Sequence, residues 1–120
     1  SVHAELVRMQ EHYHASKAAL EATMREMAVQ YGPFQIRVNA IAPGAIYMQE
    51  NPTPAKLQQG HFRDEVPLVR MGLPREVAHA AVFLASDRAS YITASTLHVD
   101  GGLSEFNWVT RQYLKEPRAK

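Results

Sequence analysis

A tyrosine and a lysine four positions apart are the residues of this sequence that could do chemistry together. Tyr13 and Lys17 open a stretch, continuing through Ala28, that is rich in the helix formers Ala, Leu, Met and Glu. Side chains four apart lie on one face of a helix, so the hydroxyl and the ammonium group would be neighbours. A cation within about 4–6 Å lowers the pKa of tyrosine from its reference of roughly 10, and such a tyrosine can exchange a proton with an alcohol or carbonyl oxygen. Taken alone, the spacing is more typical of an amphipathic surface helix, and the surrounding elements must decide between the two interpretations.

The helix that carries this pair is predicted to end at Gly32-Pro33, because glycine accepts a left-handed cap and proline cannot continue a helix. Its larger side chains recur at spacings of four and three and are expected to face a core or a ligand. These are Tyr13, Lys17, Leu20, Met24, Met27 and Tyr31. A second face is small enough for another helix to approach closely, and it consists of Ala15, Ala18, Ala19 and Ala22.

A short β-branched segment and a turn follow the helix. The alternation over Ile36–Ile41 predicts a strand, and Pro43-Gly44 then forms a turn at its carboxyl end. A helix followed by a strand that ends in such a turn is one repeat of a parallel α/β sheet, whose ligands lie beyond the carboxyl ends of the strands. Pro43-Gly44 is therefore a candidate ligand-binding turn, although the dipeptide is also typical of an ordinary turn.

The remaining elements continue this α/β order. A second helix is predicted to begin at Pro74 and to break at residues 86–88. Its expected apolar face is Val77, Ala81, Leu84 and Ala85. A second strand is predicted over Thr96–Asp100, stopped by Gly101-Gly102. Between the two units, residues 47–70 are long, polar and rich in proline, which is typical of a functional lid or a disordered loop. Their place after the Pro-Gly turn favours a lid that covers a substrate. Residues 103–120 are expected to form a docking or arm-like carboxyl-terminal tail.

Composition excludes several classes of protein. Hydrophobic residues make up 46% and charged residues 21%, as in a globular domain. A net charge of +1 favours neither a nucleic acid nor a membrane surface as partner, and no apolar run approaches the roughly 20 residues of a membrane span. No cysteine is present, and the six histidines lack the ligand spacing of a metal site. A cytoplasmic location is the default expectation. The sequence opens at Ser1 without methionine, which fits either removal of that residue or a piece of a longer chain.

Taken in order, several short motifs resemble the carboxyl-terminal half of a short-chain dehydrogenase/reductase. They are Tyr13-x-x-x-Lys17, the strand containing Asn39, Pro43-Gly44-Ala45-Ile46, Arg70-x-Gly72-x-Pro74-x-Glu76, Phe83-Leu84-Ala85-Ser86-Asp87 and Val99-Asp100-Gly101-Gly102. The resemblance covers roughly residues 1–103. Ser1-Val2-His3 looks most like the glucose 1-dehydrogenase branch, in which the catalytic serine precedes Val-His about a dozen residues before the tyrosine.

This resemblance implies an α/β fold and an activity. Residues 1–102 would be part of a doubly wound parallel Rossmann-type sheet, namely its last two strands with their helices, with the first half missing. The implied reaction is hydride transfer, dependent on NAD or NADP, between the alcohol and the ketone or aldehyde of a small molecule. Tyr13 would be the general acid/base, Lys17 would bind the nicotinamide ribose and lower the tyrosine pKa, and Ser1 would hydrogen-bond the reacting oxygen. The expected cofactor-binding residues are Tyr13, Lys17, Pro43, Gly44 and Ile46, with the Ile46 backbone bonding the carboxamide.

The sequence departs from the family mainly by lacking the motifs that belong to the amino-terminal half of its members. The sequence has no G-x-x-x-G-x-G loop, no residue that chooses between NAD and NADP and no tetrad asparagine, so its affinity for pyrophosphate should be small. Met48 stands where the family often has threonine, and Ala94 stands where glycine commonly precedes the last strand. With only two strands, the edge of the first strand and the apolar stripe of the Tyr13 helix would be exposed, which predicts marginal stability or association.

Two functions remain open at this stage. The first is that the chain is one half of a functional dehydrogenase, homo-tetrameric or dimeric in its full-length form, with a sugar favoured as substrate because of Ser1-Val2-His3. Small ketones, steroids and acyl thioesters are served by the same motifs. The second is a truncated, non-catalytic relative that acts through association with a full-length dehydrogenase. A metal protein is disfavoured.

Overall fold

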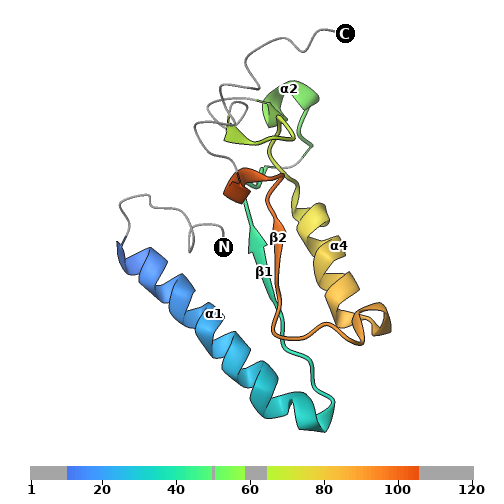
Figure 1. Cartoon of the computed structure of the whole chain (residues 1–120). Coiled ribbons are helices and arrows are strands. Elements are labelled where there is room, and N and C mark those ends of the chain that lie inside the picture. Colours follow the sequence, from blue (N-terminus) through green and yellow to red (C-terminus); the bar gives the residue numbers. More distant parts are fainter. Residues whose placement is uncertain (1–10, 50, 59–64, 106–120) are drawn as a thin grey trace, which may run out of the picture.

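The computed structural model describes residues 11–49, 51–58 and 65–105 (Figure 1). Ser1, two stretches of the expected lid (residues 50 and 59–64) and the tail beyond residue 105 lie outside the described residues. The expected roles of Ser1 and of the tail therefore rest on the sequence alone.

Two parallel strands form the sheet in the described part of the chain. β1 (Ala40–Pro43) pairs with β2 (Thr96–Val99) in a register that places Ala40 opposite Thr96 and Pro43 opposite Val99. The predicted α/β class with a parallel sheet is confirmed. β2 begins where predicted and ends one residue earlier.

β1 begins later than its sequence pattern predicts. The expected strand was Ile36–Ile41, but the ladder covers Ala40–Pro43. Before Ala40, a side chain replaces the ladder: Asn39 Nδ2 donates to the Ile92 carbonyl (2.8 Å), and the Ser95 N–H donates to Asn39 Oδ1 (3.1 Å). The extended segment is thus tied to the loop before β2 by the Asn39 side chain and by a backbone bond from the Ala94 N–H to the Val38 carbonyl (2.8 Å), rather than by a strand ladder. Alternation of residue types does not reveal this difference.

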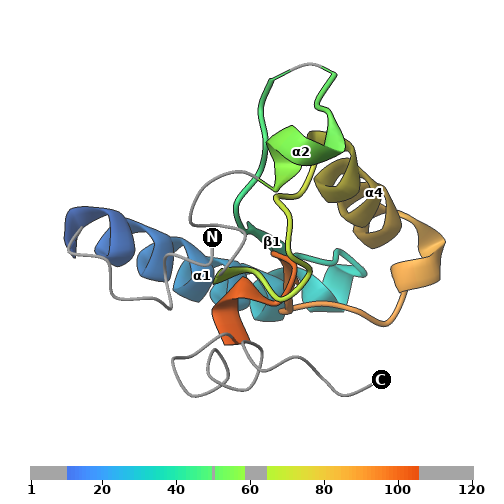
Figure 2. The same cartoon turned by 90° about the horizontal axis from the view of Figure 1, so that it is seen from above.

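Two helices enclose the strand pair. α1 (Glu11–Tyr31) lies on one side of the strands and α4 (Pro74–Ala85) on the other, and α4 packs against both strands (Figures 1 and 2). α1 runs antiparallel to the strands, so its amino-terminal end lies level with their carboxyl ends (Figure 1). Both views show α1 diverging from the strands toward that end.

The packed face of α1 is rotated relative to the predicted stripe. Leu20 and Met27 belong to the stripe that was expected to face a core or a ligand and to be left partly uncovered by the missing strands. They are 63% and 40% exposed, whereas Met24 and Ala28 are buried. Glu21 also lies on the covered side, with a half-buried side chain. A sheet of two strands is too narrow to cover the whole stripe, so part of it stays exposed. The four alanines of the second face are all exposed.

The cap of α1 also differs from expectation. The helix ends at Tyr31 as predicted, but Gly32–Phe34 continue as one 3₁₀ turn. The left-handed residue is Gln35 (φ 62°), whose N–H donates to the Gly32 carbonyl (2.9 Å), rather than Gly32 itself. Pro33 suits the first positions of a 3₁₀ turn, so the reversal is delayed until the turn is complete.

α4 begins and ends where the sequence predicts, but its packed face is narrower. Val77, Ala80 and Leu84 are half-buried at spacings of three and four, whereas the expected Ala81 and Ala85 are exposed. A 3₁₀ turn over residues 87–89 follows, in agreement with the predicted break.

Arg37 closes the carboxyl end of this helix. Its guanidinium donates to the carbonyls of Leu84 (2.7 Å) and Ser86 (3.2 Å). Carbonyls at a helix end lack intrahelical partners and carry partial negative charge, so a cation is stabilising there. This contact joins the segment before β1 to the end of α4.

Candidate active site

Tyr13 and Lys17 lie together on the first turns of α1. Lys17 Nζ is 5.3 Å from the centroid of the Tyr13 ring, a cation–π distance, and both side chains are half-buried. The pair arises from the helix repeat itself, which stacks positions four apart. The Ser16 hydroxyl donates to the Tyr13 carbonyl (2.7 Å) within the same turn. A phenol and an ammonium group are thereby held at one end of a rigid element.

Gly44 lets the ends of the two strands approach closely. Its N–H donates to the Val99 carbonyl (3.1 Å), and a Cβ at this position would lie 2.6 Å from Asp100 Cβ and 2.7 Å from Asp100 Cα. No real side chain tolerates such distances, so the turn after β1 requires glycine for the fold as well as for any ligand. Pro43, the last residue of β1, pairs with Val99.

Ile46 has its backbone polar groups directed away from the protein segment it pairs with. It forms an isolated parallel bridge with Gly72: the Gly72 N–H donates to the Ala45 carbonyl, and the Tyr47 N–H donates to the Gly72 carbonyl, both at 2.9 Å. In such a bridge the flanking residues make the bonds, so the N–H and carbonyl of Ile46 itself point to the opposite side.

The turn after β2 is fixed by the Asp100 carboxylate. It accepts hydrogen bonds from the N–H groups of Gly102 (2.9 Å) and Ser104 (2.8 Å). Burial acts to raise the pKa of Asp100, but the hydrogen bonds from Ser104 and Gly102 outweigh it and hold the pKa below its usual value. Gly101 and Gly102 are left-handed (φ 67° and 88°), and a Cβ on either would meet Val66 or Pro67 within 3 Å. The end of the expected lid therefore packs directly on this turn.

An ion pair joins the end of the lid to the start of α4. Arg70 contacts the Glu76 carboxylate with two nitrogen–oxygen distances of 2.6 and 2.9 Å, and the Leu73 N–H donates to the same carboxylate (2.8 Å). The hydrogen bond from Arg70 is the main cause that lowers the pKa of Glu76 to about 2. The Arg70-x-Gly72-x-Pro74-x-Glu76 run thus has a positional function that its spacing alone does not reveal.

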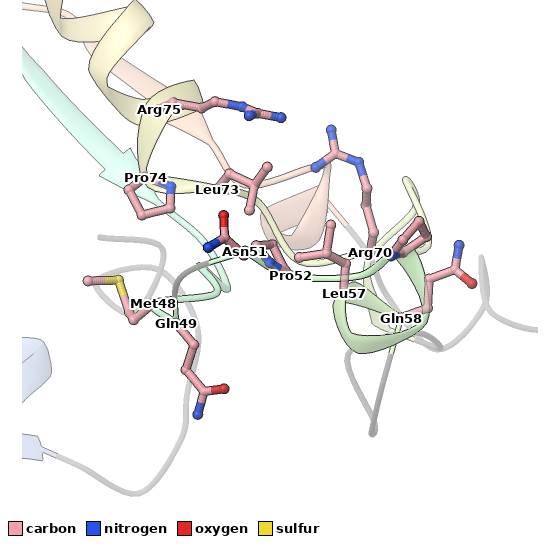
Figure 3. A pocket seen from close by; sticks show the side chains of 11 residues that line it. Met48, Gln49, Asn51, Pro52, Leu57, Gln58, Arg70, Leu73, Pro74 and Arg75 are labelled. Carbon is pink, nitrogen blue, oxygen red and sulfur yellow. The ribbon is translucent and has the colours of Figure 1, made fainter.

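Two pockets open around this ion pair. The larger, of about 720 Å³, lies between the segment after β1, the short helix α2 (Pro54–Leu57) and the start of α4 (Figure 3). Most of its wall comes from the expected lid, with apolar Pro52 and Leu57 beside polar Gln49 and Asn51. A second pocket, of about 460 Å³, lies at the carboxyl ends of the strands between Gly72 and Asp100.

The structure brings the predicted residues together in two groups. Tyr13 and Lys17 form one group, and Pro43, Gly44 and Ile46 form the other, at the carboxyl ends of the strands. α1 diverges from the strands toward the end that carries the first group, whereas the second group follows β1 (Figures 1 and 2). Sequence spacing predicted the contact within the first group and the place of the second group after β1.

The described ranges contain neither a candidate metal site nor a candidate membrane span. No group of three or more His, Asp or Glu side chains there could hold a metal ion. None of the helices in this part of the chain is both long and apolar enough to cross a membrane.

Comparison with known proteins gives consistent matches. A sequence model of the family described as enoyl-(acyl carrier protein) reductase matches residues 1–104. The peroxisomal 2,4-dienoyl-CoA reductase of Mus musculus is 41% identical over 107 residues, which cover 85% of this chain and 35% of that protein. Glucose 1-dehydrogenase of Gluconobacter oxydans is 42% identical over 107 residues, covering 80% of this chain and 39% of that protein.

A solved structure extends the comparison to three dimensions. 4-Hydroxyisoleucine dehydrogenase complexed with NADH matches with a TM-score of 0.75 at 32% identity, over 89% of this chain and 44% of that one. The chain thus spans less than half the length of each of these three proteins. The two curated relatives act on chemically different substrates at nearly equal identity, so identity alone selects neither.

Proposed function

Since the chain belongs to the short-chain dehydrogenase/reductase family, a family of oxidoreductases that use nicotinamide coenzymes, we propose that the protein carrying it transfers hydride between NAD or NADP and a small alcohol or carbonyl compound. The observation that carries this proposal is the Tyr13–Lys17 pair at the end of α1 that lies level with the carboxyl ends of the strands. Ligands of parallel α/β sheets bind at that edge.

The proposed roles follow from the chemistry of each group. When bound, the coenzyme supplies or accepts the hydride. As hydride leaves an alcohol carbon, the hydroxyl proton must leave as well, and Tyr13 Oη would receive it. The Lys17 ammonium, which lies over the Tyr13 ring, would bind the nicotinamide ribose. The Ser1 hydroxyl would donate a hydrogen bond to the same substrate oxygen.

The turn after β1 suits the nicotinamide end of the coenzyme. The backbone N–H and carbonyl of Ile46 face away from Gly72, where they can bond a carboxamide, and Gly44 presents no side chain. Pro43 would pack on the ring. The pocket walled by the lid segment supports the proposal that residues 47–70 cover the bound substrate. We propose a sugar as the first substrate class to assay, and acyl thioesters as the second.

Hydride transfer is tested by following reduced nicotinamide in a protein that contains this sequence. Sugars, hydroxyacyl thioesters and small secondary alcohols would be offered with NAD and with NADP. Turnover of one class that is abolished in Tyr13→Phe is the expected result. Turnover that persists in Tyr13→Phe would refute the mechanism, and absence of turnover with every class would refute the activity.

Association with a full-length dehydrogenase is a second candidate, favoured by the exposed alanine face of α1 and by exposed Leu20. Titration of the isolated 120-residue chain with NADH and NADPH, followed by nicotinamide fluorescence, separates the two. Tight binding would mean that this chain completes a coenzyme site. No binding at millimolar coenzyme, together with mixed oligomers formed with a full-length relative, would favour the second function.

A further inference from the structure

A carboxylate on the packed face of α1 links this helix to the sheet. Glu21 Oε1 accepts a hydrogen bond from Thr96 Oγ1 (2.8 Å), and these two residues are separated by 75 positions in the sequence. The same oxygen accepts from Arg25 NH2 (2.7 Å). The side chain of Glu21 is 19% exposed and that of Arg25 59% exposed. The carboxylate is therefore held between a strand and its own helix in a largely covered position.

Glu21 lies on the same helix face as the proposed catalytic pair. Tyr13, Lys17 and Glu21 follow one another at spacings of four, and the buried Met24 and Ala28 continue the face. The apolar contacts of Met24 and Ala28 resist separation of the helix from the sheet, but they are not directional. The Thr96–Glu21 hydrogen bond has a defined direction and fixes the rotation and height of α1 at this point.

A small change in the direction of α1 at this bond would displace Tyr13. α1 diverges from the strands toward its amino-terminal end (Figures 1 and 2), and Tyr13 lies nearer that end than Glu21 does. Tyr13 is eight residues from Glu21, which corresponds to about 12 Å along the helix axis at 1.5 Å per residue. A tilt of about 5° at the anchor would move Tyr13 by about 1 Å, a misplacement that can cost on the order of 100-fold in rate.

We infer that Glu21 and Thr96 are positioning residues that hold the Tyr13–Lys17 pair in register with the carboxyl ends of the strands. This inference rests on the proposed hydride-transfer function, but it concerns residues outside the catalytic set. Thr96 opens β2, so it belongs to the same rigid strand whose end meets Gly44. The bond thus connects the helix that carries Tyr13 and Lys17 to the strand whose carboxyl end lies beside Gly44.

Four variants of the protein that contains this sequence test the inference. Thr96→Val removes the hydroxyl while keeping the shape, and Thr96→Ser keeps the hydroxyl. Glu21→Gln keeps an acceptor oxygen but removes the charge. Thr23→Val is the matched control, because the Thr23 hydroxyl is exposed and donates within α1 to the Ala19 carbonyl (2.9 Å).

The measurements are kcat and KM, the pH profile of kcat/KM, and hydrogen exchange of the α1 amides. Thr96→Val should lower kcat about 10-fold, with the KM for coenzyme within about twofold and a displaced pH profile, because Tyr13 moves relative to the reacting oxygen. Thr96→Ser should recover most of the lost kcat, and Thr23→Val should have the kcat of the wild type. Glu21→Gln should have a kcat between that of Thr96→Val and that of the wild type.

Distinct outcomes separate failure of this inference from failure of the proposed function. If Thr96→Val keeps the kcat and pH profile of Thr23→Val, the positioning role is wrong although the enzyme is active. If the wild type transfers no hydride, the proposed function is wrong. Hydrogen exchange then still decides whether the bond anchors α1: faster exchange around residues 21–28 in Thr96→Val than in Thr23→Val supports the anchor, and equal exchange overturns it.

Discussion

At the scale of single residues, the proposed chemistry depends most directly on the hydroxyl of Tyr13. Tyr13→Phe deletes that one group from a half-buried side chain and leaves the ring contact with Lys17 in place. Loss of a general acid/base typically costs about 10²–10⁴-fold in rate, so turnover should fall by that amount while the thermal unfolding midpoint hardly changes. Tyr91→Phe is the matched control, because Tyr91 is fully exposed. A comparable loss in both variants would remove the special role of Tyr13.

Lys17→Met keeps much of the side-chain length but removes the charge. Both kcat and coenzyme affinity should fall, because the cation lies over the Tyr13 ring and is proposed to bind the nicotinamide ribose. Steady-state kinetics and a coenzyme titration check this. An unchanged kcat with unchanged coenzyme affinity would leave Lys17 without either role.

Ala94 is a residue whose backbone conformation conflicts with its type. It adopts a left-handed φ of 58° just before β2, and its N–H donates to the Val38 carbonyl (2.8 Å). The left-handed conformation costs a residue with a Cβ roughly 1–2 kcal/mol of folding free energy. Glycine avoids this cost, but its unfolded chain has more conformational entropy, which offsets part of the gain. Ala94→Gly should therefore raise the free energy of unfolding by about 0.5–1 kcal/mol, measured by urea denaturation. Ala19→Gly, in an exposed helical position, should lower it by about 1 kcal/mol.

Residue spacing predicted local pairs well and long-range pairs poorly. The contact of Lys17 with Tyr13 follows from the helix repeat, which any sequence of this spacing obeys. The close approach of Gly44 to Asp100 and the bond between Glu21 and Thr96 depend on how separate elements meet. The periodicity of residue types along the sequence does not predict contacts between separate elements, so these two contacts are known only from the structure.

At the scale of elements, the Arg70–Glu76 ion pair connects the lid to α4 and is sensitive to acid. Its carboxylate has a pKa of about 2 in the folded chain against 4.5 as reference, so it stabilises the fold above about pH 4.5 and loses this effect as pH falls toward 2. The full shift would correspond to about 3 kcal/mol, but both side chains are about one-third exposed, and solvent screening reduces the expected contribution to about 1 kcal/mol.

Glu76→Gln should therefore lower the free energy of unfolding by about 1 kcal/mol at pH 7, and the difference from the wild type should be roughly halved at pH 3. Urea denaturation at several pH values measures this. Glu26→Gln changes an exposed carboxylate of α1 and is the control. A Glu76→Gln difference that is constant from pH 7 to pH 2 would show that charge pairing is not the cause.

The elements themselves were predictable in kind and order but not in their packed faces. α1 and α4 end at the residues that their breakers indicate. The buried side of α1 is shifted from Leu20 toward Glu21, and that of α4 from Ala81 toward Ala80. Periodicity identifies every position that could be covered, whereas the width of the sheet decides which of them is covered.

At the scale of the whole molecule, the two strands of the described residues are too few to cover the helix they support. Leu20 and Met27 lie on one side of α1 and are exposed. Burying a Leu or Met side chain is worth about 1.5–3 kcal/mol, so both residues favour contact with another surface. The alanine face nearby would let a second helix approach closely.

The isolated 120-residue chain is therefore expected to self-associate. Leu20→Lys combined with Met27→Lys should weaken association by at least about 10-fold, because a loss of 1.4 kcal/mol already corresponds to that factor. Sedimentation velocity over a range of protein concentrations measures the effect. Leu68→Lys, at an equally exposed apolar residue away from α1, should leave association near the wild-type value. If Leu68→Lys dissociates the chain and the α1 variant does not, the contact surface lies at the lid. If neither does, the exposed side of α1 is not the surface through which the chains associate.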